Sequence, residues 1–250
     1  MKISIITATY NSEKTIADTL LSLEKQTYQN IEYIIIDGAS KDSTLTTINK
    51  NSTRTTTIIS EPDKGIYDAL NKGIDIATGD VIGFLHSDDL FAYPEAITDI
   101  VATFEQHKCD AVYGDLQYVS RSNINNVVRH WKSGKFHPKK IQYGWIPPHP
   151  TFYMKRELYN LWGGFSLSFK IASDYDSMLR YIVDYNAKLQ YLPKIIIKMR
   201  VGGESSRLEN SVPGSKETIQ IMRNHNIFWP IALIYRKISK LSQFLKKYYV

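Results

Sequence analysis

The first hundred residues alternate between short runs of Ile and Val and longer stretches with helical periodicity, and this alternation is the strongest constraint on the fold. After the apolar run at 3–9, Ile16, Leu20 and Leu23 recur at helical spacing. The same step repeats, so the pattern predicts strands over 3–9, 31–37, 56–60 and 80–85 and helices over 12–25, 42–50, 65–77 and 94–106. Such an alternation indicates an α/β fold with a mostly parallel central sheet, covered by helices on both faces.

The loops at one edge of such a sheet are the place to look for function. Parallel sheets bind ligands at the carboxyl ends of their strands, where the connecting loops gather. From Tyr118 to Tyr143 the periodicity is lost and Asn, Ser, Lys and His become frequent. This stretch predicts a long loop or hairpin excursion, which in compact domains commonly has a functional role.

Two adjacent carboxylates, Asp88 and Asp89, follow the fourth predicted strand. They repel each other unless a cation or hydrogen-bond donors neutralise them, and hard oxygen ligands suit Mg²⁺ or Mn²⁺ held jointly with a diphosphate. The pair therefore predicts a metal and nucleotide site. The alternative is acidic capping of the helix that starts near Pro94, for which one Asp is sufficient.

Carboxylates also follow the second and third predicted strands. Asp37 begins the sequence D-G-A-S-K-D, and Asp63 lies in E-P-D-K-G at 61–65. A carboxylate at a strand end with a glycine behind it can accept hydrogen bonds from the flat edge of a ligand. A turn followed by a helix N-cap is the other interpretation of the first segment.

A later segment, I-A-S-D-Y-D-S-M-L-R at 171–180, has the pattern of a helix start. Asp174 and Asp176 are two positions apart, so on a helix they point to different faces and cannot both enter one site. Asp174 is nearer the preceding loop and is the better candidate for a catalytic base. Arg180 is expected either to pair with Asp176 or to reach toward a phosphate.

Taken together, these motifs resemble glycosyltransferase family 2, the inverting nucleotide-sugar glycosyltransferases with the GT-A fold. The resemblance extends from Ile3 to about Gly203 and rests on five motifs that occur in order. They are I-I-T-A-T-Y-N at 5–11, I-I-I-D-G-A-S-K-D at 34–42, E-P-D-K-G-I-Y-D-A-L-N-K-G at 61–73, A-T-G-D-V-I-G-F-L-H-S-D-D at 77–89, and G-G-F to A-S-D-Y-D at 163–176.

The resemblance implies a role for each matching position. The positions expected at the nucleotide-sugar donor are Thr7, Thr9, Tyr10, Asp37, Asp63, Lys64, Gly65 and Asp88. Asp88 and Asp89 match the acidic element that holds Mn²⁺ or Mg²⁺, and Asp174 matches the catalytic base. The chain departs from the family pattern at His86, which replaces the first acid of Asp-x-Asp, and at Ser173, which precedes the base.

Two further segments contain candidate substrate-binding residues. His149 lies between prolines that restrict its backbone. In similar enzymes such a segment lies near the acceptor and the diphosphate, and a structural loop histidine is the alternative. In the glycine-containing segment 199–207, Arg200 and Arg207 either belong to a loop that closes over phosphate or are solvated side chains of an ordinary turn.

The net charge of +6 belongs to the C-terminal tail. Residues 218–250 hold six of the 31 Lys and Arg residues and none of the 25 Asp and Glu residues, so 1–217 is balanced. Nucleic-acid-binding domains spread basic residues over a folded face, so we expect no nucleic-acid partner. Apolar residues keep helical spacing at Ile231, Ile234, Ile238, Leu241, Leu245 and Tyr248. This predicts a basic amphipathic helix that lies on an anionic membrane surface or docks on the domain.

The expected organisation is one GT-A-like domain over 1–217 with a helical tail over 218–250. Residues 1–115 form the nucleotide-sugar-binding half and 116–217 the half that binds the acceptor and supplies the base. The single cysteine, Cys109, excludes an internal disulfide framework and a cysteine-based zinc cluster. No run has the apolar length of a signal peptide or membrane span. We therefore expect a cytoplasmic protein, peripheral on the inner face of the cell membrane.

The expected activity is transfer of a sugar from a nucleotide-sugar, first of all a UDP-sugar, to a hydroxyl of a glycan. The resemblance implies a lipid-linked acceptor in bacterial surface polysaccharide synthesis. One alternative is a non-catalytic module that binds a nucleotide-sugar or carbohydrate without hydrolysing the donor. A sugar nucleotidyltransferase is disfavoured because it needs a glycine-rich loop where this chain has T-Y-N-S at 9–12. The dinucleotide motif G-x-G-x-x-G is absent from that position.

Overall fold

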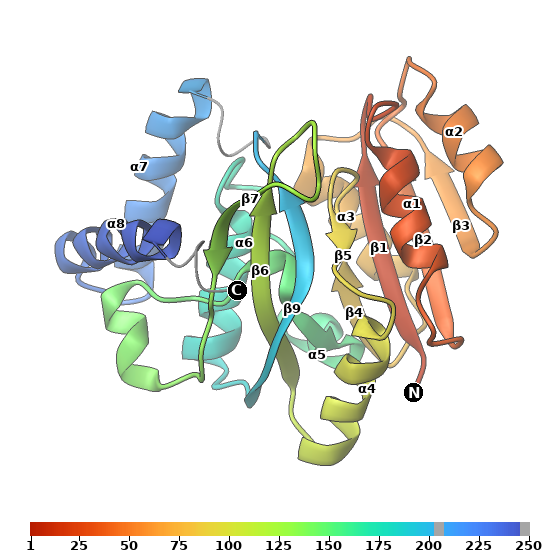
Figure 1. Cartoon of the computed structure of the whole chain (residues 1–250). Helices are drawn as coiled ribbons and strands as arrows, with labels where there is room; N and C mark the ends of the chain where they lie inside the picture. The colour runs from red at the N-terminus through yellow and green to blue at the C-terminus, as the bar shows by residue number, and fades with distance from the viewer. Residues whose placement is uncertain (203–207, 246–250) are drawn as a thin grey trace.

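The computed structural model describes residues 1–202 and 208–245 (Figure 1). The strands are β1 (Ile3–Thr9), β2 (Ile31–Asp37), β3 (Thr55–Ser60), β4 (Val81–Phe84), β5 (Leu90–Phe91), β6 (Ala111–Val119), β7 (Val127–Trp131), β8 (Tyr153–Lys155) and β9 (Leu189–Arg200). The helices are α1 (Ile16–Glu24), α2 (Thr44–Asn51), α3 (Ile66–Ile76), α4 (Ala96–His107), α5 (Arg156–Trp162), α6 (Ser173–Leu179), α7 (Leu208–Asn224) and α8 (Trp229–Leu245). Short helical turns are η1 (Pro138–Tyr143), η2 (His149–Thr151) and η3 (Arg180–Asp184).

One mixed sheet runs through the molecule in the order β3-β2-β1-β4-β8-β6-β9-β5, and β7 pairs with β6. The first four strands of this order are parallel, as predicted. Beyond β4 the sheet is no longer mostly parallel, because β8 is antiparallel to both β4 and β6 and β5 is antiparallel to β9. The predicted excursion is confirmed as a hairpin, in which β7 returns antiparallel to β6.

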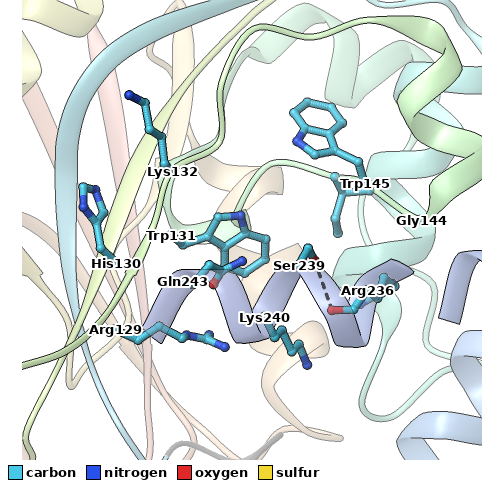
Figure 2. Close-up of a pocket in the computed structure, with 11 residues that line it drawn as sticks. Arg129, His130, Trp131, Lys132, Gly144, Trp145, Arg236, Ser239, Lys240 and Gln243 are labelled. Carbon is cyan, nitrogen blue, oxygen red and sulfur yellow. Dashed lines mark hydrogen bonds between the residues drawn. The ribbon is translucent and has the colours of Figure 1, made fainter. Parts of the chain in front are cut away.

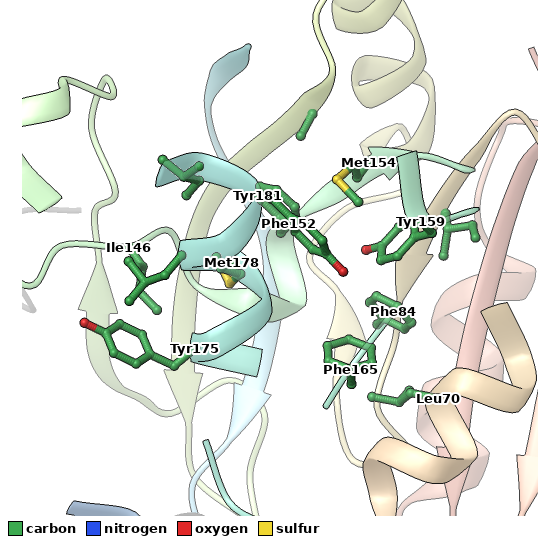
Figure 3. Packing of buried hydrophobic residues seen from close by; sticks show 14 of the residues in the cluster. Leu70, Phe84, Ile146, Phe152, Met154, Tyr159, Phe165, Tyr175, Met178 and Tyr181 are labelled. Carbon is green, nitrogen blue, oxygen red and sulfur yellow. The ribbon is translucent and has the colours of Figure 1, made fainter. Parts of the chain in front are cut away.

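Both faces of β1 and β2 are buried, which explains their continuous apolar sequence. Ile3 and Ile5 pack with α1, α2 and α4 on one face of the sheet. Ile6 and Ala8 belong to the cluster on the other face, which α3, α5 and α6 cover. Figure 3 shows part of this second cluster, with aromatic and methionine side chains filling the space between the sheet and α6.

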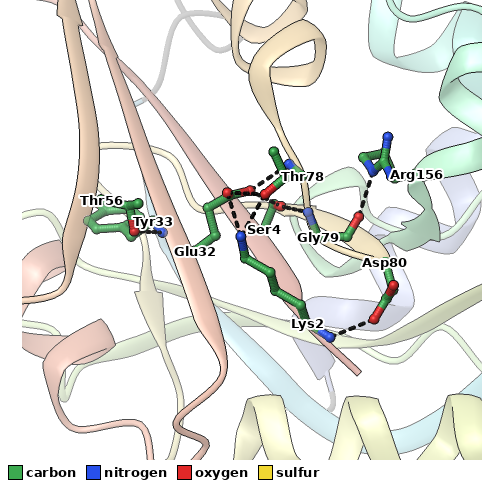
Figure 4. Close-up of polar contacts among 9 residues, drawn as sticks. All are labelled: Lys2, Ser4, Glu32, Tyr33, Thr56, Thr78, Gly79, Asp80 and Arg156. Atoms are coloured by element: carbon green, nitrogen blue, oxygen red, sulfur yellow. Dashed lines mark hydrogen bonds and ion pairs between the residues drawn. The ribbon is translucent and has the colours of Figure 1, made fainter.

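The amino ends of the parallel strands are joined by a polar network around Glu32 of β2 (Figure 4). Its carboxylate accepts hydrogen bonds from Lys2 Nζ at 2.8 Å, Ser4 Oγ at 2.5 Å and the backbone N of Thr78 at 2.7 Å. Burial acts to raise the pKa of Glu32, but these donors outweigh it and hold the pKa at about 2. This network holds the amino ends of β1 and β2 and the segment before β4 together, at the edge of the sheet opposite the loops that follow the strands.

The C-terminal helices pack on the second half of the domain. The charge distribution suggested a boundary between domain and tail after residue 217. In the structure this boundary falls inside a helix, because α7 continues without a break from Leu208 to Asn224. Ala232 of α8 is fully buried in the same core cluster as Ile221 of α7. The apolar residues Ile231, Ile234 and Ile238 are 43%, 57% and 56% exposed. α8 thus docks on the domain by one side and presents part of its predicted apolar stripe to solvent on another.

Within the described ranges, no helix combines the length and apolar character that a membrane span requires.

Candidate active site

The loops after β1, β2 and β3 meet at the carboxyl edge of the parallel sheet. Asp63 approaches Gly38 so closely that a Cβ atom at residue 38 would lie 2.5 Å from Asp63 Oδ2. The same Cβ would lie 3.4 Å from Cδ2 of Tyr10, which is itself 59% exposed. Because residue 38 is glycine, the side chains of Tyr10 and Asp63 can lie close to the backbone on either side of it. We call the place where these two side chains meet the open corner.

Asp37, in contrast, is fully buried beneath that corner. Its carboxylate accepts hydrogen bonds from the backbone N of Ser40 at 3.0 Å and from Ser60 Oγ at 2.6 Å. Asp37 therefore fixes the loops that follow β2 and β3. Lys64 and Gly65 are exposed beside Asp63, and the backbone N of Gly65 donates to Asp63 Oδ1 at 2.8 Å.

The two threonines of β1 differ from one another. Thr7 is fully buried, and its hydroxyl donates to the carbonyl of Leu85 at 2.6 Å, so it holds the end of β4 from inside the core. Thr7 points to the face covered by α1 and α2 and contacts Tyr33 there. Thr9 is 4% exposed, and its Oγ1 has no hydrogen-bond partner among the described residues. Only Thr9 of this pair has a hydroxyl left for a ligand.

The two carboxylates of the acidic pair occupy different environments. Asp88 is half-buried, whereas Asp89 is fully buried and neither of its carboxylate oxygens has a hydrogen-bond partner in the described part of the chain. Burial and the neighbouring charge of Asp88 raise the pKa of Asp89 well above its usual range, although Arg200 opposes this. Asp88 is therefore the acid available to a ligand at the sheet edge, with Asp89 enclosed behind it.

The candidate base lies in the first turn of α6. Oδ1 of Asp174 is 3.1 Å from the hydroxyl oxygen of Tyr67, and the same hydroxyl is 2.8 Å from the carbonyl oxygen of Ile171. Burial raises the pKa of Asp174, and the Tyr67 hydroxyl, the Tyr175 backbone N–H and the positive charges of His86 and Arg236 only partly oppose the rise. A carboxylate with a raised pKa at a ligand-binding edge has the properties of a general base.

His86 connects the acidic pair with the base. Burial lowers the pKa of its imidazole, while the charges of both Asp88 and Asp174 act in the opposite direction. Both carboxylates therefore act electrostatically on the same imidazole. The ring of His149 lies 5.8 Å from that of His86 and stacks on Phe84 at 5.2 Å. Burial, with a contribution from His86, lowers the pKa of His149 to about 3, so its imidazole is neutral.

Asp176 faces away from this site, as the two-residue spacing predicted. Its carboxylate lies 3.6 Å from Nε2 of His225 in the segment after α7. Tyr67, which the sequence pattern does not single out, is the side chain that joins the two halves of the site. The available signal was its position in I-Y-D at 66–68, directly after the E-P-D-K-G loop.

Two of the three predicted substrate-binding arginines, Arg180 and Arg200, form hydrogen bonds within the protein. The guanidinium of Arg180 donates to the carbonyls of Trp162 and Gly164, so it does neither of the things expected of it. Arg200 is 3% exposed, donates to the carbonyl of Asp88 at 2.9 Å and pairs with Asp18. Arg200 thus fixes the backbone of Asp88 by a hydrogen bond from inside the protein. Arg207 lies outside the described residues.

A divalent cation fits this site only in company with a substrate. Among the described residues, no three His, Cys, Asp or Glu side chains come together as a ready-made metal centre. Mg²⁺ and similar ions are commonly bound by one or two carboxylates together with substrate phosphates. Asp88 supplies such a carboxylate, and the orphaned oxygens of Asp89 lie behind it.

The sheet with helices on both faces matches the GT-A fold of glycosyltransferases. Residues 4–174 match the model of Glycosyl transferase family 2, and the chain belongs to this family. A PGL/p-HBAD biosynthesis glycosyltransferase of Mycobacterium bovis is 30% identical over 181 residues, which cover 71% of this chain and 68% of the relative. An uncharacterised glycosyltransferase of Haemophilus influenzae is 26% identical, with 99% of this chain and 88% of the relative covered.

Solved structures share the fold. S. aureus TarS 1–349 in complex with UDP-GlcNAc superposes with a TM-score of 0.67 at 23% identity, over 98% of this chain and 72% of that one. The longer TarS structure is matched over 44% of its length. The mannosyltransferase PcManGT of Pyrobaculum calidifontis, in complex with GDP-Man and Mn²⁺, gives a TM-score of 0.67 at 18% identity, over 89% of this chain and 63% of that one.

Proposed function

We propose that the protein transfers a sugar from a UDP-sugar to a hydroxyl group of a glycan acceptor, with inversion at the anomeric carbon. The observation that carries the proposal is the match of residues 4–174 to Glycosyl transferase family 2. The charges of Asp88 and Asp174, which both act on His86, support the assignment of the two carboxylates to one site. The UDP-GlcNAc in the TarS complex and the GDP-Man in the PcManGT complex support a nucleotide-sugar donor.

In this proposal the open corner of Tyr10 and Asp63 binds the nucleotide base, with Thr9, Lys64 and Gly65 beside it. Asp37 and Thr7 support that corner from within. Asp88, with Asp89 behind it, would hold Mn²⁺ or Mg²⁺. Such a cation would supply positive charge to stabilise the negative charge that develops on the leaving diphosphate.

The chain's own chemistry is the removal of a proton. Oδ2 of Asp174 is not engaged by Tyr67, which contacts Oδ1, and it is the oxygen assigned to the acceptor hydroxyl. As that hydroxyl attacks the anomeric carbon, Asp174 accepts its proton and the bond to the diphosphate breaks on the opposite face. A single displacement of this kind inverts the anomeric configuration. His149, buried near His86 with Nε2 unpartnered in the described structure, lines the acceptor side.

We further propose that the acceptor is lipid-linked and that α8 holds the enzyme at the inner face of the membrane. The exposed isoleucines of α8 support this, together with a tail that carries six basic residues and no acidic ones. A surface polysaccharide of a bacterium is the acceptor class we assign.

The decisive test compares Asp174→Asn with the matched control Asp176→Asn, because the second carboxylate faces His225 instead of the site. General-base assistance is typically worth about 10²–10⁴ in rate, so we expect Asp174→Asn to lower sugar transfer by at least about 10². Donor binding, measured by thermal shift with UDP-, GDP- and dTDP-sugars and Mn²⁺, should persist. More than half of wild-type turnover in Asp174→Asn would remove it as the base.

A further inference from the structure

A carboxylate from the tail helices holds the loop that leads into the proposed base. Oε1 of Glu217 in α7 accepts a hydrogen bond from the backbone N of Lys170 at 2.9 Å. Its Oε2 accepts from the backbone N atoms of Ile171 and Ala172, each also at 2.9 Å. Hydrogen bonds to an ionised acceptor are roughly twice as strong as those between neutral groups. One side chain therefore fixes three consecutive residues of the loop, which ends two positions before Asp174.

The start of α6 has no side-chain cap of its own. Ala172 precedes the first turn, and its methyl group cannot accept a hydrogen bond. Ser173 uses its hydroxyl to donate to the carbonyl of Ser166 at 2.7 Å. Ala172 is buried, so its backbone N–H needs a partner inside the protein. Glu217 supplies that partner from 45 residues further along the chain.

The helix that carries Glu217 packs directly on the same loop. Gly214 lies about one helical turn before Glu217, and a Cβ atom at residue 214 would lie 3.1 Å from Cγ2 of Ile171. Further along α7, Ile221 and Met222 are fully buried in the core cluster to which α6 also contributes. Glycine at residue 214 thus lets α7 come close enough for the carboxylate of Glu217 to reach the loop backbone.

The carboxyl end of α7 is fixed as well. His225 lies between two carboxylates, with Nε2 3.6 Å from Oδ1 of Asp176 and Nδ1 3.1 Å from Oδ1 of Asp184. Beyond it, α8 packs closely on Gly144, where a Cβ atom would lie 2.9 Å from Cγ of Arg236. Figure 2 shows α8 passing beside this segment, at the edge of a cavity that both line. The position of α7 is therefore set by contacts with the domain at both of its ends.

Ile171 connects Glu217 with the base. Its backbone N donates to Glu217, and its carbonyl oxygen is 2.8 Å from the hydroxyl oxygen of Tyr67. The same hydroxyl is 3.1 Å from Oδ1 of Asp174. Burial is the main cause that raises the pKa of Tyr67, and the charges of Asp174 and Glu217 add to it. A shift of residues 170–172 would move both the turn that carries Asp174 and the carbonyl that Tyr67 contacts.

We propose that Glu217 is a positioning residue for sugar transfer, whose carboxylate holds residues 170–172 so that Asp174 faces the acceptor hydroxyl. This inference rests on the proposed function for the role of Asp174 as the base. Glu217 acts through the loop and through Tyr67, and not on a substrate. It is also the last acidic residue of the sequence. The tail helices therefore complete the active site.

The test is Glu217→Gln, which keeps the size of the side chain but replaces one acceptor oxygen with an amide NH₂ group that cannot accept a hydrogen bond. A misplacement of about 1 Å can cost about 10² in rate, so we expect kcat to fall about 10- to 100-fold. The KM of the donor should not change, because the open corner lies apart from this loop. The matched control is Glu105→Gln, the same change at an exposed position of α4, which should transfer as wild type does.

A double-mutant cycle separates positioning from a loss of folded protein. Combined with Tyr67→Phe, Glu217→Gln should lower kcat by less than the product of the two single effects, because both act on Asp174 through one contact. Effects that multiply overturn the proposal, since a smaller folded fraction reduces kcat independently of Tyr67.

Amide hydrogen exchange tests the contact without the reaction. In Glu217→Gln the peptide containing residues 170–172 should exchange faster than in the wild type, with β1 unchanged. Unchanged exchange at 170–172, or an unchanged kcat, overturns the inference. Failure of the proposed function would appear differently, as a wild-type protein that transfers no sugar from UDP-, GDP- or dTDP-sugars although Glu217→Gln still speeds exchange at 170–172.

Discussion

The hydroxyl of Tyr67 has one proton and two acceptors, the carbonyl of Ile171 and the carboxylate of Asp174. By donating to the carboxylate it favours the charged form and lowers the pKa of Asp174, against the burial that raises it. In the proposed mechanism the base must be unprotonated to act, so we expect transfer to rise with pH as Asp174 loses its proton. Tyr67 is a positioning residue in this scheme, because it acts on the base and not on the substrate.

Tyr67→Phe should therefore move the acidic limb of the pH–rate profile to higher pH. With this donor removed, burial is opposed less and the pKa of Asp174 rises further. We also expect kcat at neutral pH to fall about tenfold, since the carboxylate is less firmly oriented. The measurement is kcat against pH for the wild type and for Tyr67→Phe, with Tyr185→Phe as the control because it lies outside the site. A lower kcat with an unmoved acidic limb would show that Tyr67 has only a structural role.

At the scale of single residues, the sequence pattern indicates where a side chain lies better than whether it is open to a ligand. The end of a strand identifies Asp88 because the carboxyl edge of a parallel sheet is a place that topology dictates, whereas Asp174 is indicated by a helix start and by the family resemblance. Whether a given carboxylate is open or enclosed depends on side chains brought from afar. Asp89 is enclosed beside Arg200 of β9, more than a hundred residues away, and Arg180 is used to hold the carbonyls of the loop before α6.

At the scale of elements, Gly83 is a close-packing position in β4, the strand that leads to the acidic pair. A Cβ atom there would lie 2.1 Å from Cε1 of Tyr153 in β8, a ring that is fully buried. Gly83→Ala should therefore destabilise the fold by about 1–3 kcal/mol, because the ring has no room to shift. Urea denaturation measures the change.

A double-mutant cycle tests the cause. If the clash with Tyr153 is responsible, Gly83→Ala combined with Tyr153→Ala should cost clearly less than the sum of the two single changes. Strict additivity would mean that the methyl group is accommodated and that the loss, if any, arises from the backbone.

The first four strands and helices are predictable for a reason specific to their elements. β1, β2 and β4 are apolar runs buried on both faces, β3 alternates between exposed and partly buried residues, and each of the first four helices has one apolar stripe. The later strands lack that signal. β9 contains Pro193, Lys194 and Lys198 and is only partly buried, and β8 has three residues, so their pairing is settled by contacts with β6 and β4.

At the scale of the whole molecule, acid stability depends on Glu32, which ties β1, β2 and the segment after α3 together (Figure 4). Its pKa is about 2 in the folded chain against an ordinary value of 4.5. The stabilisation is therefore fully present above about pH 4.5 and is lost as the pH falls through about 2. The difference corresponds to about 3 kcal/mol in the free energy of unfolding.

Glu32→Gln should remove this pH dependence. We expect the variant to be less stable than the wild type at pH 7 and the gap to narrow as the pH falls from 4.5 toward 2. Urea denaturation at pH 7, 4 and 3 measures it. Parallel stability curves for the two proteins would show that Glu32 is not the group whose protonation weakens the fold.

α8 has two different sides. On one side the guanidinium of Arg236 lies over the ring of Tyr175, with its carbon 4.4 Å from the ring centroid. On another, Ile231, Ile234 and Ile238 are exposed to solvent. In the membrane proposal, the exposed isoleucines enter the bilayer while the other side of the helix stays packed on the domain.

The membrane proposal predicts that Ile234→Ser combined with Ile238→Ser weakens binding to vesicles containing phosphatidylglycerol by at least about tenfold. Burying an isoleucine side chain contributes about 1.5–3 kcal/mol, and about 1.4 kcal/mol is a factor of ten in affinity. The control is Leu161→Ser, which removes an even more exposed apolar side chain, 74% accessible, from α5. Flotation with the full chain is the measurement. Equal binding by the double variant and the wild type would show that the stripe does not enter the bilayer, and the six basic residues of the tail would then have to act by charge alone.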